Sequence, residues 1–390
     1  MTSVDRIVTP AFLRIWLGSF GIFFAFGVTL LAVPLYARDE LAARDIAIGL
    51  AVGAASVSAV LVSPASGRLA DRHGRRLLLV GGAAIMLVGY LALLLGPPLP
   101  ALAAIRLLAG AGEAAFVIGA FTVVADLAPV ERRGEAMSLI TVATYGGLAA
   151  GPFVGDVLVG DGRFELAWLA AAACTAAGGA LALSLPETRP EGATPAGKAL
   201  LPPRTALAPA LVLLLALIGF GGFNAFVALY AREIDVRPGV VFALFGIVIL
   251  LVRALGRKIP DRFGGRATAS GACALIAAGL VTMALWQEPA GLLLGTAIFA
   301  LGQSLAYPAV TLLAIARTPP AERSAAIGAV GAAVDSALGL GALALGTTAE
   351  VAGYDGAFLV AAVVAATGLL VLARLAHGPA PAAAASTAPP

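Results

Sequence analysis

Three charged side chains lie well inside long stretches of sequence that are mostly apolar. Arg106 and Glu113 share one stretch, and Asp335 lies in another. A seven-residue interval puts Arg106 and Glu113 on the same face of a helix but about 10 Å apart along its axis, which strains a direct ion pair. A carboxyl group in an apolar environment can exchange a proton near neutral pH, and a nearby arginine can modulate that exchange. We therefore predict proton exchange at Glu113 or Asp335 with Arg106 as modulator; a static Glu113–Arg106 packing pair is the alternative.

The surrounding sequence has the composition of a membrane protein. Hydrophobic residues make up 60% of the 390 residues and charged residues only 12%, against about 25% in soluble domains. Twelve apolar stretches are long enough for transmembrane helices, and they lack the alternation of a transmembrane β-barrel. They cover residues 11–36, 46–66, 77–97, 99–126, 135–158, 165–185, 205–231, 238–255, 267–286, 289–316, 323–348 and 352–375. The predicted fold class is an all-α integral membrane protein with twelve transmembrane helices.

The distribution of basic residues predicts the orientation of these helices. With both termini in the cytoplasm, 19 of the 25 Lys and Arg residues fall on the cytoplasmic side and five on the opposite side, and only Arg106 remains inside a helix. Loops rich in Lys and Arg stay in the cytoplasm. We therefore predict a multi-pass protein of the cell membrane (inner or plasma) with both termini cytoplasmic. The net charge of +3 follows from this topology, and no water-facing basic segment interleaved with aromatic residues indicates nucleic-acid binding.

Several features recur at about half the chain length. Leu35-Tyr36-Ala37-Arg38 matches Leu229-Tyr230-Ala231-Arg232, and Asp71-Arg72-His73-Gly74 resembles Asp261-Arg262-Phe263-Gly264. The same order of features in both parts of the chain indicates an internal repeat.

The Pro-rich polar segment 189–204 separates the two repeats and is typical of a cytoplasmic linker. We predict pseudo-symmetric six-helix bundles at 1–188 and 205–376, and a disordered Ala/Pro tail at 377–390. Two parallel repeats suit alternating access, in which the halves rock about a central site.

Neutral polar side chains lie at matching depths in the two halves. An offset near 190 residues relates Glu113 to Gln303 and Asp335 to Tyr145. Polar groups from both halves then converge on one central depth, as a site at the repeat interface requires. We predict a substrate-binding site that consists of Asn224, Gln303, Tyr145 and Tyr307. Simple contacts between helices are the alternative role for these residues.

Two glycine-containing motifs stand out. The charged segment between stretches 46–66 and 77–97 reads Gly67-Arg-Leu-Ala-Asp71-Arg72-His-Gly74-Arg75-Arg76. Positive charge that merely orients the flanking helices would need neither the glycines nor Asp71. The second motif is the run Gly147, Gly151, Pro152 and Gly155, whose small residues allow close helix packing and whose proline allows a kink.

With these motifs the chain resembles transporters of the major facilitator superfamily over nearly its whole length. The segment 67–76 is similar to the superfamily's signature between its second and third helices. Arg106-Leu-Leu-Ala-Gly110-Ala-Gly112 resembles its fourth-helix signature, and Pro186-Glu-Thr-Arg189 resembles the end of its sixth helix. The run 147–155 resembles the fifth-helix signature of antiporters, with Asp156 where a second glycine is usual. The nearest group is the proton-driven efflux transporters for drugs or sugars.

The resemblance implies roles for the residues of both motifs. A conformational latch, present in only one access state, would consist of Gly67, Asp71, Arg72, Gly74, Arg75, Arg76 and Asp126. In this latch Asp71 would face the N-terminus of the helix at 323–348, and Arg75 would pair with Asp126. Gly147, Gly151, Pro152 and Gly155 would form the antiporter-type motif, with simple packing as the alternative.

We therefore predict a secondary active transporter, in the first place a proton-coupled antiporter that exports a small organic molecule by alternating access. A proton symporter that imports a sugar or an organic acid is the alternative, and an integral-membrane enzyme or receptor is the remote one. We predict no enzymatic activity, no cofactor and no metal, because the two histidines form no catalytic cluster and Cys174 and Cys273 lack metal-binding spacing. The expected partners are a small-molecule substrate, protons and the lipid bilayer, without nucleic acid, and the resemblance implies a monomer.

Overall fold

The computed structural model describes residues 7–129, 132–160, 162–189, 203–256 and 259–377, and the regular structure within these ranges is helical. The N-terminal helices are α1 (Pro10–Asp39), α2 (Asp45–His73), α3 (Arg75–Leu93), α4 (Leu99–Leu127), α5 (Arg133–Val159) and α6 (Phe164–Leu183). The C-terminal helices are α7 (Arg204–Glu233), α8 (Pro238–Leu255), α9 (Ile259–Phe263), α10 (Gly265–Leu285), α11 (Pro289–Arg317), η3 (Pro320–Glu322) and α12 (Arg323–His377). The linker and the tail predicted at 189–204 and 377–390 lie almost entirely outside the described residues.

The long helices form where apolar sequence is flanked by residues that start helices. Helices α1, α4, α8 and α11 each have a proline in the first turn, where its missing N–H leaves no hydrogen bond unmade. The hydroxyl of Thr9 accepts a hydrogen bond from the N–H of Phe12 at 3.1 Å and caps α1. In the described chain, eleven helices are long and apolar enough to cross a membrane.

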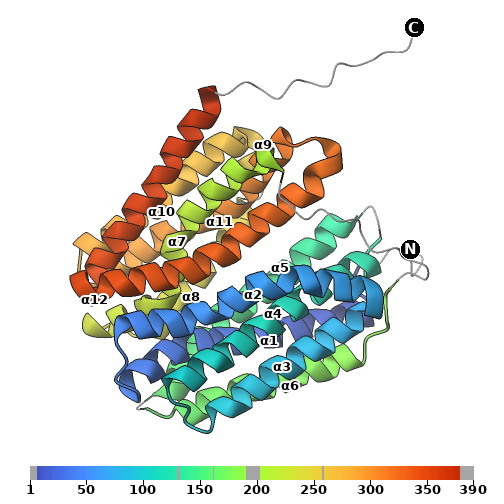
Figure 1. Cartoon of the computed structure of the whole chain (residues 1–390), viewed down its shortest axis with the longest axis horizontal. Coiled ribbons are helices and arrows are strands. Elements are labelled where there is room, and N and C mark those ends of the chain that lie inside the picture. Colours follow the sequence, from blue (N-terminus) through green and yellow to red (C-terminus); the bar gives the residue numbers. More distant parts are fainter. Residues whose placement is uncertain (1–6, 130–131, 161, 190–202, 257–258, 378–390) are drawn as a thin grey trace.

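The helix α12 accounts for two of the twelve predicted spans. Its 55 residues would extend about 80 Å at 1.5 Å per residue, whereas a bilayer core is about 30 Å thick. The backbone leaves the helical region at Gly353 (φ 73°, ψ 176°), and the chain doubles back there (Figure 1). The two arms of α12 match the predicted stretches 323–348 and 352–375, so the structure supports the twelve-span, all-α prediction.

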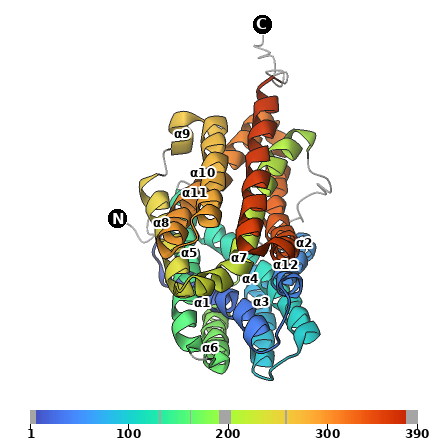
Figure 2. The ribbon, with the colours of Figure 1, turned by 90° about the vertical axis from the view of Figure 1, so that its left-hand side faces the viewer.

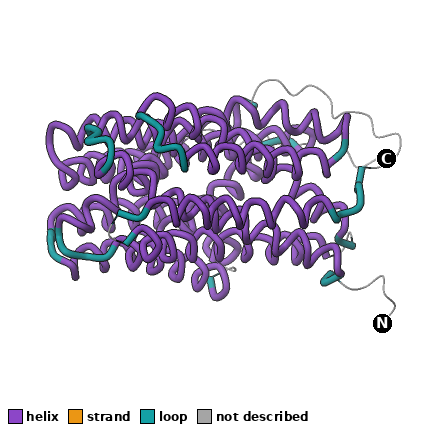
Figure 3. Tube along the Cα trace, turned by 90° about the horizontal axis from the view of Figure 1, so that it is seen from below, coloured by secondary structure: helices purple, strands orange, loops and turns teal. Residues whose placement is uncertain are grey.

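The helices form two bundles that lie side by side. Figures 1 and 2 show α1–α6, coloured blue to green, against α7–α12, coloured yellow-green to red. Most helices run roughly along the long axis of the molecule, and the described loops gather at its two ends (Figure 3). Within the bundles α1 packs on α5 and α6, and α7 packs on α12; between them α2 contacts α12 and α5 contacts α8.

The internal repeat predicted from the sequence has structural counterparts. Gly74 precedes α3 with a φ of 103°, and Gly264 precedes α10 with a φ of 79°. The repeat-related tyrosines also make equivalent contacts: the hydroxyl of Tyr36 donates to the carbonyl of Pro97 at 3.2 Å, and that of Tyr230 donates to the carbonyl of Met283 at 2.8 Å. Each tyrosine thus ties the first helix of its half to the end of the third span.

The turn at Gly353 generates a first prediction. Gly353→Ala should destabilise the protein by about 1–3 kcal/mol, because a side chain there is forced into a conformation that glycine alone adopts easily. The added Cβ would also lie 2.6 Å from a carboxylate oxygen of Asp355. The measurement is thermal unfolding of the purified protein in detergent. Gly331→Ala is the matched control, since no atom lies within 4 Å of a Cβ at that position; equal melting temperatures for the two variants would contradict the prediction.

Candidate substrate and proton site

The two bundles touch over one half of their length and separate over the other. A Cβ built on Gly53 of α2 would lie 3.0 Å from the carbonyl oxygen of Gly339, and one on Gly239 of α8 would lie 2.8 Å from the Cβ of Asp156. Further along the same helices, a Cβ on Gly67 or Gly331 would meet no atom within 4 Å. We call the end that carries Gly353 the pocket end, and the end that carries residues 67–76 the hairpin end.

Ion pairs join the two bundles at the pocket end. Arg232 contacts Asp39 at 2.7 Å, Arg44 contacts Glu350 at 2.6 Å, and Arg237 contacts Asp156 at 3.4 Å. These are all the ion pairs between the bundles among the described residues.

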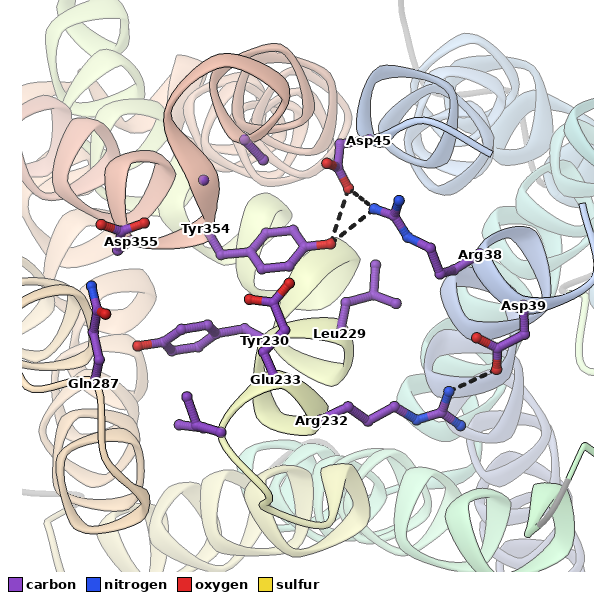
Figure 4. Close-up of a pocket in the computed structure, with 13 residues that line it drawn as sticks. Arg38, Asp39, Asp45, Leu229, Tyr230, Arg232, Glu233, Gln287, Tyr354 and Asp355 are labelled. Carbon is purple, nitrogen blue, oxygen red and sulfur yellow. Dashed lines mark hydrogen bonds and ion pairs between the residues drawn. The ribbon is translucent and has the colours of Figure 1, made fainter. Parts of the chain in front are cut away.

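The same end contains a polar pocket of about 620 Å³. Arg38 of α1 and Arg232 of α7, which are related by the repeat, both line it, and Figure 4 shows Arg38 directed at Asp45 and Tyr354 and Arg232 directed at Asp39. Tyr354 of α12 donates a hydrogen bond to Asp45 at 3.0 Å and accepts one from Arg38 at 2.9 Å. The pocket end is therefore closed by polar contacts between the halves.

Arg106 lies deep between α4 and α1. It is 2% exposed; its Nη1 donates a long hydrogen bond of 3.4 Å to Thr29, and its guanidinium carbon lies 5.7 Å from the ring centre of Phe26. No carboxylate of the described residues lies within 4.0 Å of Arg106, and its Nε has no hydrogen-bond partner. The direct Glu113–Arg106 pair, which the sequence left open as an alternative, is therefore not formed.

Arg253 lies in the last turn of α8, at the end of the predicted stretch 238–255, and makes a contact with the other half. It belongs to α8 and points toward α5, where its Nη2 donates a hydrogen bond of 2.9 Å to the hydroxyl of Tyr145. Its guanidinium carbon lies 4.2 Å from the centre of the Tyr145 ring. The sequence analysis assigned Arg253 to the cytoplasmic side because it lies close to the end of the apolar stretch 238–255.

The predicted substrate-site residues are only partly brought together. Tyr145 and Asn224, from opposite halves, line one small cavity of about 20 Å³ together with apolar side chains. Tyr307 of α11 is 37% exposed, and no hydrogen bond between described residues joins it to Tyr145 or Asn224. Gln303 is buried on α11 with its amide nitrogen unpartnered, and no described contact joins it to the others.

The two candidate proton carriers belong to different halves. Glu113 of α4 and Asp335 of α12 are both half-buried. Neither carboxylate forms an ion pair with a described residue. In the described part of the chain, no group of three His, Cys, Asp or Glu residues could hold a metal ion.

The glycine run on α5 faces α1, within its own half. A Cβ on Gly147 would lie 2.5 Å from the carbonyl oxygen of Phe20, and one on Gly155 would lie 3.3 Å from the Cα of Val28. Gly151 packs in the same way against the carbonyl of Phe24, and Pro152 contacts Gly27. The geometry therefore gives this motif a packing role, and its association with antiport comes from the resemblance alone.

The hairpin residues form a polar network inside the N-terminal half. The Nε of Arg75 lies 3.2 Å from Asp126, as the resemblance implied, and its Nη2 lies 3.6 Å from Asp71. The backbone carbonyl of Arg72 accepts a hydrogen bond from Arg189. Asp71 thus contacts Arg75 of its own half here, and a Cβ on Gly67 would meet no neighbouring atom.

Glu187 completes this network, and the sequence analysis did not identify it. Its carboxylate accepts hydrogen bonds from the backbone N–H groups of Arg75 at 2.9 Å and Arg76 at 3.2 Å, and so caps α3. Burial alone would raise the pKa of Glu187, but the N–H groups of Arg75, Arg189, Arg76 and Thr188 outweigh burial and lower that pKa. Gly74 lies directly against this carboxylate.

Comparison with known proteins agrees with this architecture. The family model of the Major Facilitator Superfamily matches residues 15–290 and 238–389. An uncharacterized MFS-type transporter of Salmonella typhimurium is 33% identical over 357 residues, which cover 89% of this chain and 91% of the relative. The crystal structure of the nucleoside transporter NupG has a TM-score of 0.76 at 14% identity, covering 95% of this chain and 100% of that one. A POT family transporter in complex with a thioalcohol-conjugated peptide has a TM-score of 0.81 at 14% identity, covering 94% of this chain and 96% of that one.

The family match and the curated relatives identify the protein as a transporter and not an enzyme. The chain belongs to the Major Facilitator Superfamily. At 14% identity the solved structures share the fold alone with this chain.

The capping by Glu187 generates a second prediction. Glu187→Gln should destabilise the protein at neutral pH by about 1 kcal/mol or less, because an exposed charged cap is partly screened by water. A lowered folded-state pKa means that this stabilisation is present above the unfolded pKa and is lost as the pH falls through the folded value. The difference in thermal unfolding between wild type and variant should therefore shrink as the pH falls below the usual glutamate pKa of about 4.3.

Glu165→Gln is the control for this measurement, since Glu165 is exposed and makes no hydrogen bond in the described chain. An equal loss in the Glu165 variant, or a difference for Glu187 that persists at low pH, would contradict the capping role.

Proposed function

We propose that the protein is a proton-coupled antiporter that exports a small organic molecule by alternating access. The observation that carries the proposal is the pair of half-buried carboxylates, Glu113 and Asp335, one in each half and inside membrane-spanning helices. Neither forms an ion pair with a described residue. An ionised carboxylate near the bilayer centre is unfavourable by at least a few kcal/mol, so a proton can neutralise it in one access state and leave it in the other.

The positions of the contacts between the halves support an inward-facing state. The hairpin end carries most of the arginines, and basic loops remain in the cytoplasm, so we assign this end and both termini to the cytoplasm. The halves meet at the pocket end and separate toward the hairpin end. A site between them would then load from the cytoplasm, as export requires.

The proposed substrate site lies between the halves at the depth of Tyr145. Asn224, Gln303 and Tyr307 of the C-terminal half are the other proposed contacts, and Arg106 would modulate the proton on Glu113. We propose that the protein acts as a monomer in the cell membrane.

The proton site generates a third prediction. Glu113→Gln should abolish proton exchange, because the amide cannot carry a proton, while Glu165→Gln should leave exchange unchanged. The measurement is the internal pH of everted membrane vesicles that are energised with a proton gradient and challenged with a panel of drugs and sugars. Collapse of the gradient in wild type and in the Glu165 variant alone supports antiport through Glu113.

Two other outcomes would change this assignment. Unchanged coupling in Glu113→Gln together with loss in Asp335→Asn would move the proton to Asp335. A compound that collapses the gradient by leaving preloaded vesicles together with protons, and not by entering in exchange for them, would contradict antiport and favour the symport of a sugar or an organic acid.

The hairpin network generates a fourth prediction. We propose that residues 67–76 with Asp126 act as a latch in the outward-facing state, when the hairpin end closes and Asp71 can reach the N-terminus of α12. Asp71→Asn should therefore slow substrate exchange in proteoliposomes several-fold while substrate binding stays unchanged. A variant that folds normally but no longer binds substrate would contradict the latch.

A further inference from the structure

Arg253 is a half-buried cation that has no anion beside it among the described residues. It lies in the last turn of α8, where its side chain turns toward the other half. Its one hydrogen bond in the described chain goes to the neutral hydroxyl of Tyr145. No described carboxylate lies within 4.0 Å of it, and its Nε is buried without a hydrogen-bond partner.

Arg75 of the same protein is an arginine whose charge is balanced by neighbouring carboxylates. Its guanidinium contacts the carboxylates of Asp126 and Asp71 and donates a further hydrogen bond to the carbonyl of Ala70 at 3.1 Å. Both arginines are at least partly buried, but only Arg75 has its charge balanced. The missing partner of Arg253 therefore has the chemistry of a carboxylate or a phosphate, which the planar guanidinium binds with two parallel hydrogen bonds.

The contact with Tyr145 prepares Arg253 for such a partner. The guanidinium lies over the phenol ring, and this stacking together with the hydrogen bond to the hydroxyl holds the planar group in one orientation. Stacking leaves the N–H edge that is not bonded to Tyr145 available. Fixing the side chain in advance reduces the entropy that is lost when a ligand binds.

We propose that Arg253 binds an anionic group of the transported molecule, a carboxylate or a phosphate, with Tyr145 orienting the guanidinium. The proposal rests on the proposed function for the statement that the occupant is the substrate. The expected substrates are small organic anions and zwitterions.

The neighbouring carboxylates define how such a substrate couples to protons. Ionised Asp335 repels an anion on Arg253, so a proton on Asp335 would strengthen the binding of the anion, which is the coupling of a symporter. Antiport instead requires that the substrate and the proton compete for the same carboxylate. A cationic group on the same molecule, placed at Glu113 of the opposite half, competes with the proton in this way.

The test measures how fast phenylglyoxal modifies Arg253 of the full-length wild-type protein in phosphatidylcholine nanodiscs, with mass spectrometry as the readout. Benzoate and phenylphosphonate should slow modification of Arg253 several-fold, and benzamide at the same concentration and ionic strength should not. Arg262 is the internal control, because it is exposed at the hairpin end and should react at the same rate throughout.

Several outcomes of the labelling experiment would overturn the proposal. One is modification that no anion slows, and another is equal protection by benzamide. The third is the absence of modification in any condition, because an anion of the size of phenylglyoxal could then not reach the site. Protection by phosphatidylglycerol in the nanodisc, without added anion, would assign the site to a lipid headgroup and also contradict a substrate role.

A variant series separates binding from folding. Benzoate should raise the melting temperature of wild type and of Arg262→Gln by the same amount. The increase should be smaller for Arg253→Lys and absent for Arg253→Gln. A benzoate effect that survives in Arg253→Gln would overturn the proposal. The labelling result does not depend on proton coupling. A failure to detect antiport in vesicles would therefore not contradict the anion site, and a failure of the labelling test would not contradict antiport.

Discussion

The unfavourable free energy of a charge in a hydrocarbon environment constrains the whole molecule. Placing one charged side chain near the bilayer centre costs from a few to more than about 10 kcal/mol, which is comparable with the total stability of a domain, about 5–15 kcal/mol. Arg106 and Glu113 on α4, Arg253 on α8 and Asp335 on α12 are nevertheless inside spans. Arg253 contacts the opposite half, and Glu113 and Asp335 belong one to each half, so we infer that the surface between the halves is where the protein tolerates charge.

The two ends of the molecule use different interactions for different purposes. At the pocket end, ion pairs such as Arg232–Asp39 and Arg44–Glu350 are partly exposed, and such pairs contribute only about 0–1 kcal/mol each. Contacts of that size can be exchanged for water when the halves separate. At the hairpin end, Arg75 and Glu187 join α2, α3, α4 and the segment after α6 into one network. Such a network favours movement of the N-terminal half as one body.

Sequence reasoning predicted the spans and the repeat because hydropathy, length and motif spacing are local properties of the chain. It did not identify Arg253, because a long side chain near the end of an apolar stretch can point toward water or back along the helix, and only the packing of α5 decides this. Glu187 was missed since its partners are more than 100 residues away in sequence. The spacing of Gly147, Gly151 and Gly155 showed that one face of α5 carries small residues. That α1 is the helix packed against this face follows only from the tertiary structure.

The contact between Tyr145 and Arg253 links these constraints. Among the described residues it is the one hydrogen bond between the halves that lies away from the pocket end. Because its two residues belong to different halves, movement of one half against the other must break or rebuild it. A ligand shifts a conformational equilibrium only through a difference in affinity for the two states. An anion that binds the free N–H edge of Arg253 provides such a difference, since Tyr145 orients the guanidinium for it only while the two halves are in contact at this depth.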